Sequence, residues 1–299
     1  SWLLQAIGNN KGIIIDQDVG TTGVLDFTTG NFTNGGVFPM NNGAPAGLVY
    51  GRSDISAIFV ATLTQTLTTP TLVYSTDNGA NWITYDLTSK GILGNINGVA
   101  YNPLRNRWVL SAFDGTTNRF YYSSSATDAF QAMTWTKANG TANQALTRIS
   151  GGALAGGGYG FAIGCLSQTS NVFTTIDDIN WSIPATIPTY SASIQTYYMC
   201  GMFVCAPNFS SNPFILVSTD GINFTKFNVP VDAYRCGSVG GNIIIPNTST
   251  PYYVSLSYAY VIPSSNLSNI VPQAAWSGTQ QIMAGVGSTS GGIARQVAT

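Results

Sequence analysis

Short apolar runs alternate with polar segments along the whole chain, and they come in pairs. The first run of each pair is mostly aliphatic, and the second, which follows a polar loop, is richer in aromatic residues. Runs this short, separated by turn-forming residues, are typical of β-hairpins and too short for amphipathic helices. The pattern predicts seven hairpins, with first strands at 12–15, 57–60, 108–110, 161–163, 202–204, 243–245 and 282–284 and second strands at 24–27, 72–74, 120–122, 172–174, 214–217, 252–254 and 293–295.

The hairpins recur roughly every 40 to 50 residues, which leaves room for two further strands in each repeat. One of these is an outer strand that begins near an aromatic residue, at Trp82, Trp135, Trp181 or Phe224, and the other is an inner strand rich in small residues, as at 97–100 and 150–153. Four antiparallel strands in a repeat of this length are typical of a β-propeller blade. We therefore predict an all-β chain in which residues 1–299 form a single β-propeller domain of seven four-stranded antiparallel blades, with six blades as the alternative.

The last repeat contains only its inner strand and its hairpin. Residues 1–4 offer an outer strand for it, with Trp2 in the position that an aromatic residue holds in other repeats. A strand placed there would cover an open sheet edge. We therefore predict that the N-terminal strand closes the ring.

A turn motif follows three of the hairpins. Residues 75–82 read Ser-x-Asp-x-Gly-x-x-Trp, and residues 175–181 and 218–224 are copies that are one residue shorter. In such a turn the Asp side chain accepts hydrogen bonds from nearby backbone N–H groups. The motif resembles the Asp box of sialidase-like and Asp-box repeat β-propellers, which implies a structural role for Ser75, Asp77, Gly79, Trp82, Thr175, Asp177, Trp181, Ser218, Asp220 and Phe224.

Composition removes several classes of function. Only 8% of the residues are charged and the net charge is −1, so no basic patch for nucleic acid is expected. No apolar run is long enough to insert into a membrane. The four cysteines lack the paired spacing of a zinc site and are read as buried free thiols, with a bridge between Cys200 and Cys205 left open.

An enzymatic function has little support in the residues present. The resemblance to sialidases would imply three arginines, a Tyr nucleophile activated by a Glu, and an Asp acid/base. The chain has neither Glu nor His, which removes that carboxylate, the Ser-His-Asp triad and the usual zinc ligands. We predict a protein that is not an enzyme, and a divergent glycosidase that uses two Asp residues stays open.

The ligand face of such a fold lies opposite the Asp boxes, and its loops supply the candidate binding residues. Tyrosine rings stack on sugars, while Asp and Arg hydrogen-bond to hydroxyl groups. The candidates are Asp114, Arg119, Arg148, Tyr190, Tyr197, Asp232, Tyr234 and Arg235, and 232–235 is the first choice. No cofactor is predicted; Asp16 and Asp18 suggest at most a structural Ca²⁺ site, and the preferred interpretation is that they satisfy turn amides.

We expect a recognition domain that binds a cell-surface receptor, a glycan or a protein. Few charges and many Gly, Ser, Thr and Asn residues resemble the composition of phage appendage proteins, so a phage tail or virion spike is the favoured setting, with an extracellular or virion-surface location. The alternatives are a secreted lectin with one sugar site per blade, a scaffold that assembles other proteins, and the divergent sialidase-like glycosidase.

Overall fold

The computed structural model describes residues 2–8, 10–40, 45–52, 57–63, 70–124, 130–166, 171–187, 193–207, 213–229, 236–239, 242–245, 252–254, 259–261, 273–276, 280–286 and 291–297. Within this part of the chain the regular structure is almost entirely β-strand. One short 3-10 helix, η2 (Thr88–Lys90), is the exception with assigned bounds. No helix of the described residues is long and apolar enough to cross a membrane.

The described strands form seven antiparallel sheets, and in every sheet neighbouring strands are consecutive in the chain. The first three sheets contain β1 (Trp2–Gly8), β2 (Lys11–Asp16), β3 (Thr21–Asp26) and β4 (Phe32–Val37); β5 (Pro45–Arg52), β6 (Ala57–Leu63), β7 (Thr71–Ser75) and β8 (Ile83–Asp86); and β9 (Asn95–Asn102), β10 (Arg107–Phe113), β11 (Asn118–Ser123) and β12 (Trp135–Ala142).

The fourth sheet has three described strands, the fifth and sixth have four, and the seventh has three. They contain β13 (Leu146–Ala153), β14 (Tyr159–Cys165) and β15 (Val172–Thr175); β16 (Ile194–Met199), β17 (Met202–Pro207), β18 (Phe214–Ser218) and β19 (Thr225–Asn228); β20 (Gly237–Val239), β21 (Asn242–Ile245), β22 (Tyr252–Val254) and β23 (Ala259–Val261); and β24 (Gln273–Trp276), β25 (Gln280–Val286) and β26 (Gly291–Val297).

The seven predicted hairpins are confirmed as the second and third strands of the seven sheets, each pair antiparallel. The all-β class is confirmed as well, and the four-stranded antiparallel arrangement is confirmed for five of the seven described sheets. These central strands are short apolar runs because both faces are covered: all five residues of β7 and all six of β17 are buried. By contrast, every residue of the outer strand β19 is exposed.

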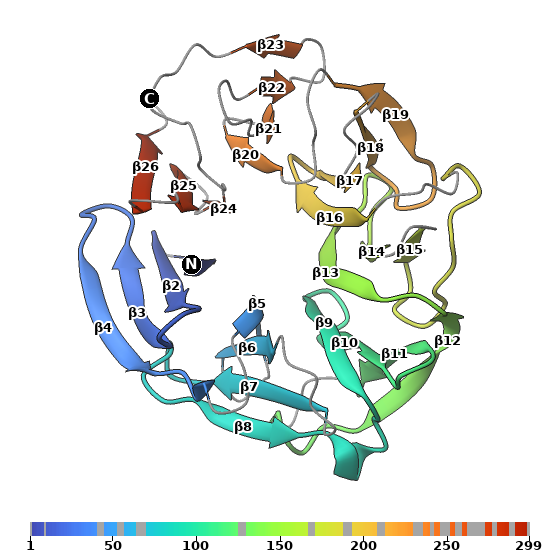
Figure 1. Cartoon of the computed structure of the whole chain (residues 1–299), viewed down its shortest axis with the longest axis horizontal. Coiled ribbons are helices and arrows are strands. Elements are labelled where there is room, and N and C mark those ends of the chain that lie inside the picture. Colours follow the sequence, from blue (N-terminus) through green and yellow to red (C-terminus); the bar gives the residue numbers. More distant parts are fainter. Residues whose placement is uncertain are drawn as a thin grey trace.

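The first strands of the sheets line the centre of the molecule, and the sheets are arranged around them (Figure 1). Successive first strands contact one another from β1 through β5, β9 and β13 to β16, and β24 contacts both β20 and β1. The small residues predicted for this position lie where expected, since 97–100 falls in β9 and 150–153 in β13.

The predicted place of the N-terminal strand is wrong. Leu3 and Leu4 pair with Ile15 and Ile14, so β1 is the innermost strand of the first sheet. It does not join the last sheet as an outer strand. The reason lies in β2, whose residues 12–15 are all buried and which pairs with a strand at each edge, β1 and β3.

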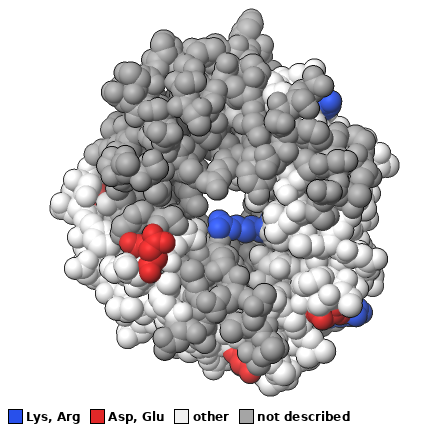
Figure 2. All heavy atoms as spheres, in the orientation of Figure 1, with Lys and Arg blue, Asp and Glu red and all other residues white. Residues whose placement is uncertain are grey.

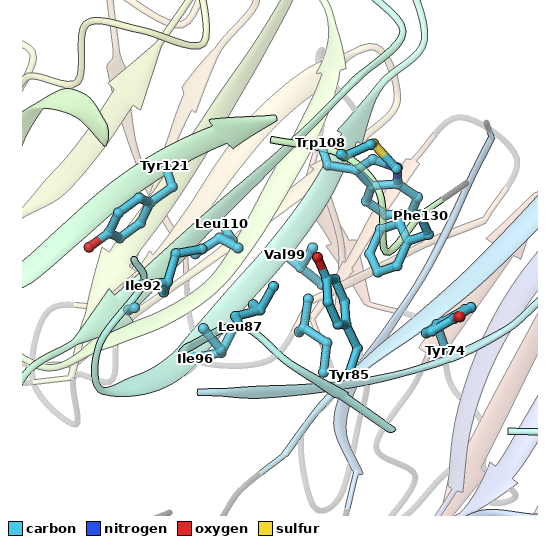
Figure 3. Packing of buried hydrophobic residues seen from close by; sticks show 13 residues of the cluster. Tyr74, Tyr85, Leu87, Ile92, Ile96, Val99, Trp108, Leu110, Tyr121 and Phe130 are labelled. Carbon is cyan, nitrogen blue, oxygen red and sulfur yellow. The ribbon is translucent and has the colours of Figure 1, made fainter. Parts of the chain in front are cut away.

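The core consists of clusters that lie between neighbouring sheets. In one of them Tyr74 and Tyr85 of the second sheet pack against Val99 and Trp108 of the third, and Phe130 fills the space between them (Figure 3). Phe130 is 2% exposed although it lies outside any strand. Comparable clusters join the third sheet to the fourth, the fourth to the fifth and the fifth to the sixth.

Candidate ligand-binding site

The two ends of the sheets carry different chemistry. Because the strands are antiparallel and in chain order, the turn after a first strand and the turn after a third strand lie at the same end. The Asp boxes follow the third strands β7, β15 and β18, so we call this end, with turns 76–82, 103–106, 176–181 and 219–224, the Asp-box end. The turn at 114–117 and the connection at 143–145 lie at the opposite end.

Each Asp box is a turn that its own carboxylate holds closed. Asp220 Oδ1 accepts hydrogen bonds from the backbone N–H groups of Ile222 and Asn223, both at 2.8 Å. Ser218 Oγ donates to the same oxygen at 2.9 Å, and Asn223 Nδ2 donates to Asp220 Oδ2 at 2.8 Å. Both carboxylate oxygens are therefore engaged inside the turn.

The other two boxes repeat this arrangement. Asp177 accepts from Thr175, Ile179 and Asn180, and Asp77 accepts from Ser75 and Asn81. Burial opposes ionisation of all three carboxyls, but the hydrogen bonds outweigh it and lower the pKa of Asp77, Asp177 and Asp220. Gly79, buried and with φ of 80°, occupies the left-handed position of the first box.

Two of the three Asp-box turns also dock on the outer strand of the preceding sheet. Gly36 N on β4 donates to Gly79 O at 2.8 Å. Asn139 N on β12 donates to Ile179 O at 2.8 Å, and Trp181 N donates back to Asn139 O at 3.1 Å. Each of these turns therefore ties its own sheet to the outer strand of the previous one.

The aromatic residue of the motif packs between sheets. Trp181 is buried and stacks on Phe120 of β11, with ring centroids 4.3 Å apart and an interplanar angle of 6°. Trp82 makes an edge contact with Phe38 at 5.4 Å, and Phe224 is buried among the residues of the fourth and fifth sheets. In all three boxes the aromatic side chain therefore packs between two neighbouring sheets and holds them together.

A buried ion pair adds a further link at this end. Asp178 has no exposed side-chain surface, and Arg105 Nη1 lies 3.2 Å from its Oδ1. Asn102 Nδ2 donates to the same oxygen at 2.9 Å, and Arg105 Nη2 donates to Ile176 O at 2.9 Å. Burial raises the pKa of Asp178 despite these partners. The pair connects the β9–β10 turn of the third sheet to the Asp box of the fourth.

At the opposite end, Asp114 and Arg119 form an ion pair across one hairpin. Asp114 Oδ2 lies 3.0 Å from both Nε and Nη2 of Arg119, and Oδ1 accepts from the backbone N–H groups of Thr116 and Thr117. The backbone bonds from Thr117 and Thr116, with the Thr116 hydroxyl and Arg119, hold the pKa of Asp114 far below its usual value. The structure therefore commits Asp114 to its own turn.

Arg148 is exposed and lies on β13, the innermost strand of the fourth sheet. A Cβ added to Gly47 of β5 would lie 3.4 Å from Arg148 Cδ and 3.5 Å from its Nε. The strand between them is β9, which contacts both β5 and β13. The Arg148 side chain thus reaches past one inner strand to the next, which places it over the central opening.

The surface is hollowed at the centre, and Figure 2 shows a basic side chain beside that opening. The inner strands supply little charge to it. Within their bounds, β1, β5, β9, β13, β16, β20 and β24 contain no Asp, Glu or Lys, and their two charged residues are Arg52 and Arg148. Of these two, the structure describes the side chain of Arg148, which supplies a positive charge at the opening although the whole chain carries a net charge of −1.

Tyr197, another candidate, lies on β16 next to the opening but turns toward the core. It is half-buried and packs against the cluster that joins the fifth and sixth sheets, which includes Met202 and Val204. Tyr190, Asp232, Tyr234 and Arg235 lie outside the described residues. Of the eight predicted binding residues, the structure therefore brings Arg148 to the central opening. Asp114 and Arg119 lie at the hairpin turn 114–117, at the end of the sheets opposite the Asp boxes.

The structure also describes Asp16, which was predicted to satisfy turn amides, and the four cysteines, which were predicted to be buried thiols. Asp16 Oδ1 accepts a hydrogen bond from Asp18 N at 2.8 Å, and the part of the chain that the structure describes holds no group of three or more Asp or Cys side chains that could bind a metal ion. None of the four cysteines forms a disulfide, so the bridge between Cys200 and Cys205 is not made; Cys165, Cys205 and Cys236 are buried as predicted, whereas Cys200 is half-buried. Burial raises the pKa of Cys165 to about 11, which makes it a poor nucleophile at neutral pH.

Two features of the site were not predicted from the sequence. The Asn that precedes the aromatic residue of each box, at 81, 180 and 223, binds the box carboxylate through its side chain, and its recurrence after Asp77, Asp177 and Asp220 was a usable signal. The ion pair of Asp178 with Arg105 spans 73 residues, and no local pattern announces it.

These sheets, ringed around inner strands and fastened by Asp boxes, define a β-propeller. A solved structure described as "Streptogramin B lyase structure" is similar over 94% of this chain and 89% of its own, with a TM-score of 0.64 and 10% sequence identity. Two structures of YCF48, one bound to D1 peptide and one from Cyanidioschyzon merolae, are 13% and 12% identical, cover 84% of this chain and 72% and 78% of their own, and give TM-scores of 0.48.

The chain matches no protein-family profile, and no curated protein matches it. At this level of identity the similarity to solved structures shows the fold alone. The function must therefore be argued from the residues of this chain.

Proposed function

We propose that this β-propeller is a recognition domain that binds a cell-surface glycan at its central opening and does not turn the glycan over. The observation that carries the proposal is the exposed Arg148 side chain, which reaches across the inner strands toward Gly47. Ligand sites in proteins are concave and present a few polar groups that fix orientation. An opening with one cationic side chain among small and amide-bearing residues suits a sugar better than an apolar peptide.

The assignment as a binding protein is supported by what five of the nine described Asp carboxylates do. Asp77, Asp177 and Asp220 are engaged inside Asp boxes, Asp178 is paired with Arg105, and Asp114 is paired with Arg119. Glycoside hydrolysis needs two carboxyl groups that flank the scissile bond. None of these five carboxylates lies on an inner strand, and the chain has no Glu.

We further propose that residues 1–299 form one domain with seven blades, one for each described sheet. The contacts of β1 with both β5 and β24 support a ring in which the first and last sheets are neighbours. The seven sheets favour seven blades over six. The low charge and the richness in Gly, Ser, Thr and Asn support a setting on a phage tail or virion spike, outside the cell.

A glycan array probed with the purified protein tests this function, followed by incubation of any bound glycan with excess protein and mass spectrometry of the recovered sugar. Binding with the sugar recovered unchanged is expected. Cleavage of the sugar would assign a glycosidase instead, and binding to no glycan at all would refute glycan recognition.

A further inference from the structure

Sulfur-bearing side chains gather at one hairpin turn of the fifth sheet. Residues 199–202 read Met-Cys-Gly-Met, so two of the chain's five methionines and one of its four cysteines fall within four consecutive residues. The turn joins β16 to β17, and because β16 is a first strand, the turn lies at the Asp-box end. We propose that Met199, Cys200 and Met202 form a binding site for one Cu(I) ion, a site that goes beyond the proposed glycan recognition and does not depend on it.

The hairpin brings the three side chains to one side of the sheet. Met199 and Met202 are directly opposed partners of β16 and β17, and directly opposed residues project from the same face with their Cβ atoms about 4.5–5.5 Å apart. Met202 belongs to the buried cluster that joins the fifth and sixth sheets, and both Met199 and Cys200 pack against that cluster. One thiol and two thioethers therefore lie together beside the turn.

Cys200 has a backbone conformation that cysteine rarely adopts. Its φ is 52° and that of Gly201 is 75°, and a two-residue type I′ hairpin turn requires positive φ at both positions. Asn, Asp and Gly are the usual residues at the first of these positions, because they tolerate the left-handed region best. The turn by itself therefore does not account for a thiol at position 200.

The burial of the three residues suits an ion that enters from solvent and is then shielded. Met199 and Cys200 are half-buried, whereas Met202 is only 4% exposed. An ion at this turn can therefore reach the thiol from outside and be covered on its inner side by the thioether of Met202. Shielding from water favours soft sulfur ligands over hydration.

The chemistry of the ligand set selects the metal. Thiolate and thioether groups are soft ligands that favour Cu(I), whereas carboxylate and carbonyl oxygens suit Mg²⁺ and Ca²⁺. A structural zinc site needs four ligands drawn chiefly from Cys and His. This chain has no His, and the turn supplies one thiol, so the set fits Cu(I) and not Zn²⁺.

Competition with the chromophoric chelator bicinchoninate, under anaerobic and reducing conditions, tests the site. We expect the unmodified protein to withdraw one equivalent of Cu(I) from the chelator. Cys200→Asn should abolish the withdrawal while the melting temperature stays the same or rises, because Asn is favoured at positive φ. This variant therefore separates loss of a ligand from loss of the fold.

Met199→Leu and Met202→Leu remove the sulfur and keep the apolar packing at similar volume. Each should weaken Cu(I) binding by about tenfold or more, since loss of a residue that merely supports a metal ligand already costs that much. Met133→Leu, in the buried cluster between the second and third sheets, and Cys165→Ala, on β14, are the matched controls and should leave Cu(I) binding unchanged.

Thermal melts establish that each variant is folded. Failure of the unmodified protein to withdraw Cu(I) from the chelator would overturn the proposal. Equal withdrawal by the unmodified protein and by Cys200→Asn would overturn it too, because the ion would then be bound elsewhere. Either result would leave glycan binding at the central opening unaffected.

Discussion

At the scale of single residues, the Asp-box carboxylates decide how the turns at one end of the molecule are held. Asp220 accepts hydrogen bonds from two backbone N–H groups and two side chains of its own turn, and Asp177 does the same. The Asn three residues later contributes through both its backbone and its side chain. A sequence motif that first suggests sialidase chemistry is, in this chain, a device for closing turns.

Replacing Asp220 by Ala should lower the free energy of unfolding by about 1–3 kcal/mol, because several donors lose their acceptor. Urea unfolding followed by circular dichroism measures this. Asp86→Ala is the matched control, since Asp86 is exposed and its carboxylate binds Thr88 alone among the described contacts. An equal loss in both variants would show that the Asp-box bonds contribute nothing special.

The pH dependence of stability should follow the same carboxylates. The lowered pKa values of Asp77, Asp177 and Asp220 mean that their contribution is complete above the ordinary Asp value of about 3.9 and is lost as the pH falls through the lowered folded values. Asp178 has the opposite sign, because burial raises its pKa and protonation on acidification relieves that cost.

Since the boxes outnumber Asp178, the free energy of unfolding should fall below about pH 4. Urea unfolding from pH 7 to pH 3 measures the slope, which should be shallower in Asp220→Asn. A stability that rises steadily toward pH 3 would contradict this assignment of the carboxylates.

At the scale of elements, the first two Asp-box turns dock on the outer strands of the preceding sheets, β4 and β12. Gly36 of β4 lies so close to the first box that an added Cβ would come within 2.2 Å of Ala80 O. Trp181 reaches Phe120 across the junction of the third and fourth sheets. The boxes therefore act between sheets as much as within turns.

Gly36→Ala should separate β4 from the first Asp box and lower the melting temperature by several degrees, a loss of about 1–3 kcal/mol. Differential scanning calorimetry measures it. At Gly156 an added Cβ meets nothing within 4 Å, so Gly156→Ala should change stability by less than about 0.5 kcal/mol. Equal melting temperatures for Gly36→Ala and Gly156→Ala would contradict the close contact between β4 and the first Asp box.

The hairpins could be predicted from the sequence because apolar runs of three or four residues between turn-forming segments are too short for helices and are typical of β-strands. The outer strand expected near Trp181 could not be predicted correctly. There the chain forms a single bridge to β15, between Thr174 and Ser182, and the fourth sheet has three described strands. Pro184 follows two residues later and has no N–H to continue a ladder.

At the scale of the whole molecule, the arrangement of inner strands creates the candidate site. Arg148 lies beside Gly47 because β5, β9 and β13 meet around the centre, and no local pattern joins residues a hundred positions apart. From the sequence, Arg148 was a candidate binding residue only because the repeat pattern placed it at a loop of the predicted ligand face. Its position over the opening, and the absence of carboxylates from the inner strands, required the three-dimensional fold.

The N-terminal strand illustrates the same limit. A repeat pattern shows that a strand exists at 2–8 but not which edge it joins, because pairing is decided by the burial of its neighbours. Here β2, buried from 12 to 15, takes β1 as its inner partner.

A crystal structure of the protein with a glycan identified on the array tests the central claim most directly. We predict an intact sugar in the central opening, in contact with the Arg148 side chain. An intact sugar bound elsewhere, or a cleaved one in the opening, would contradict the account.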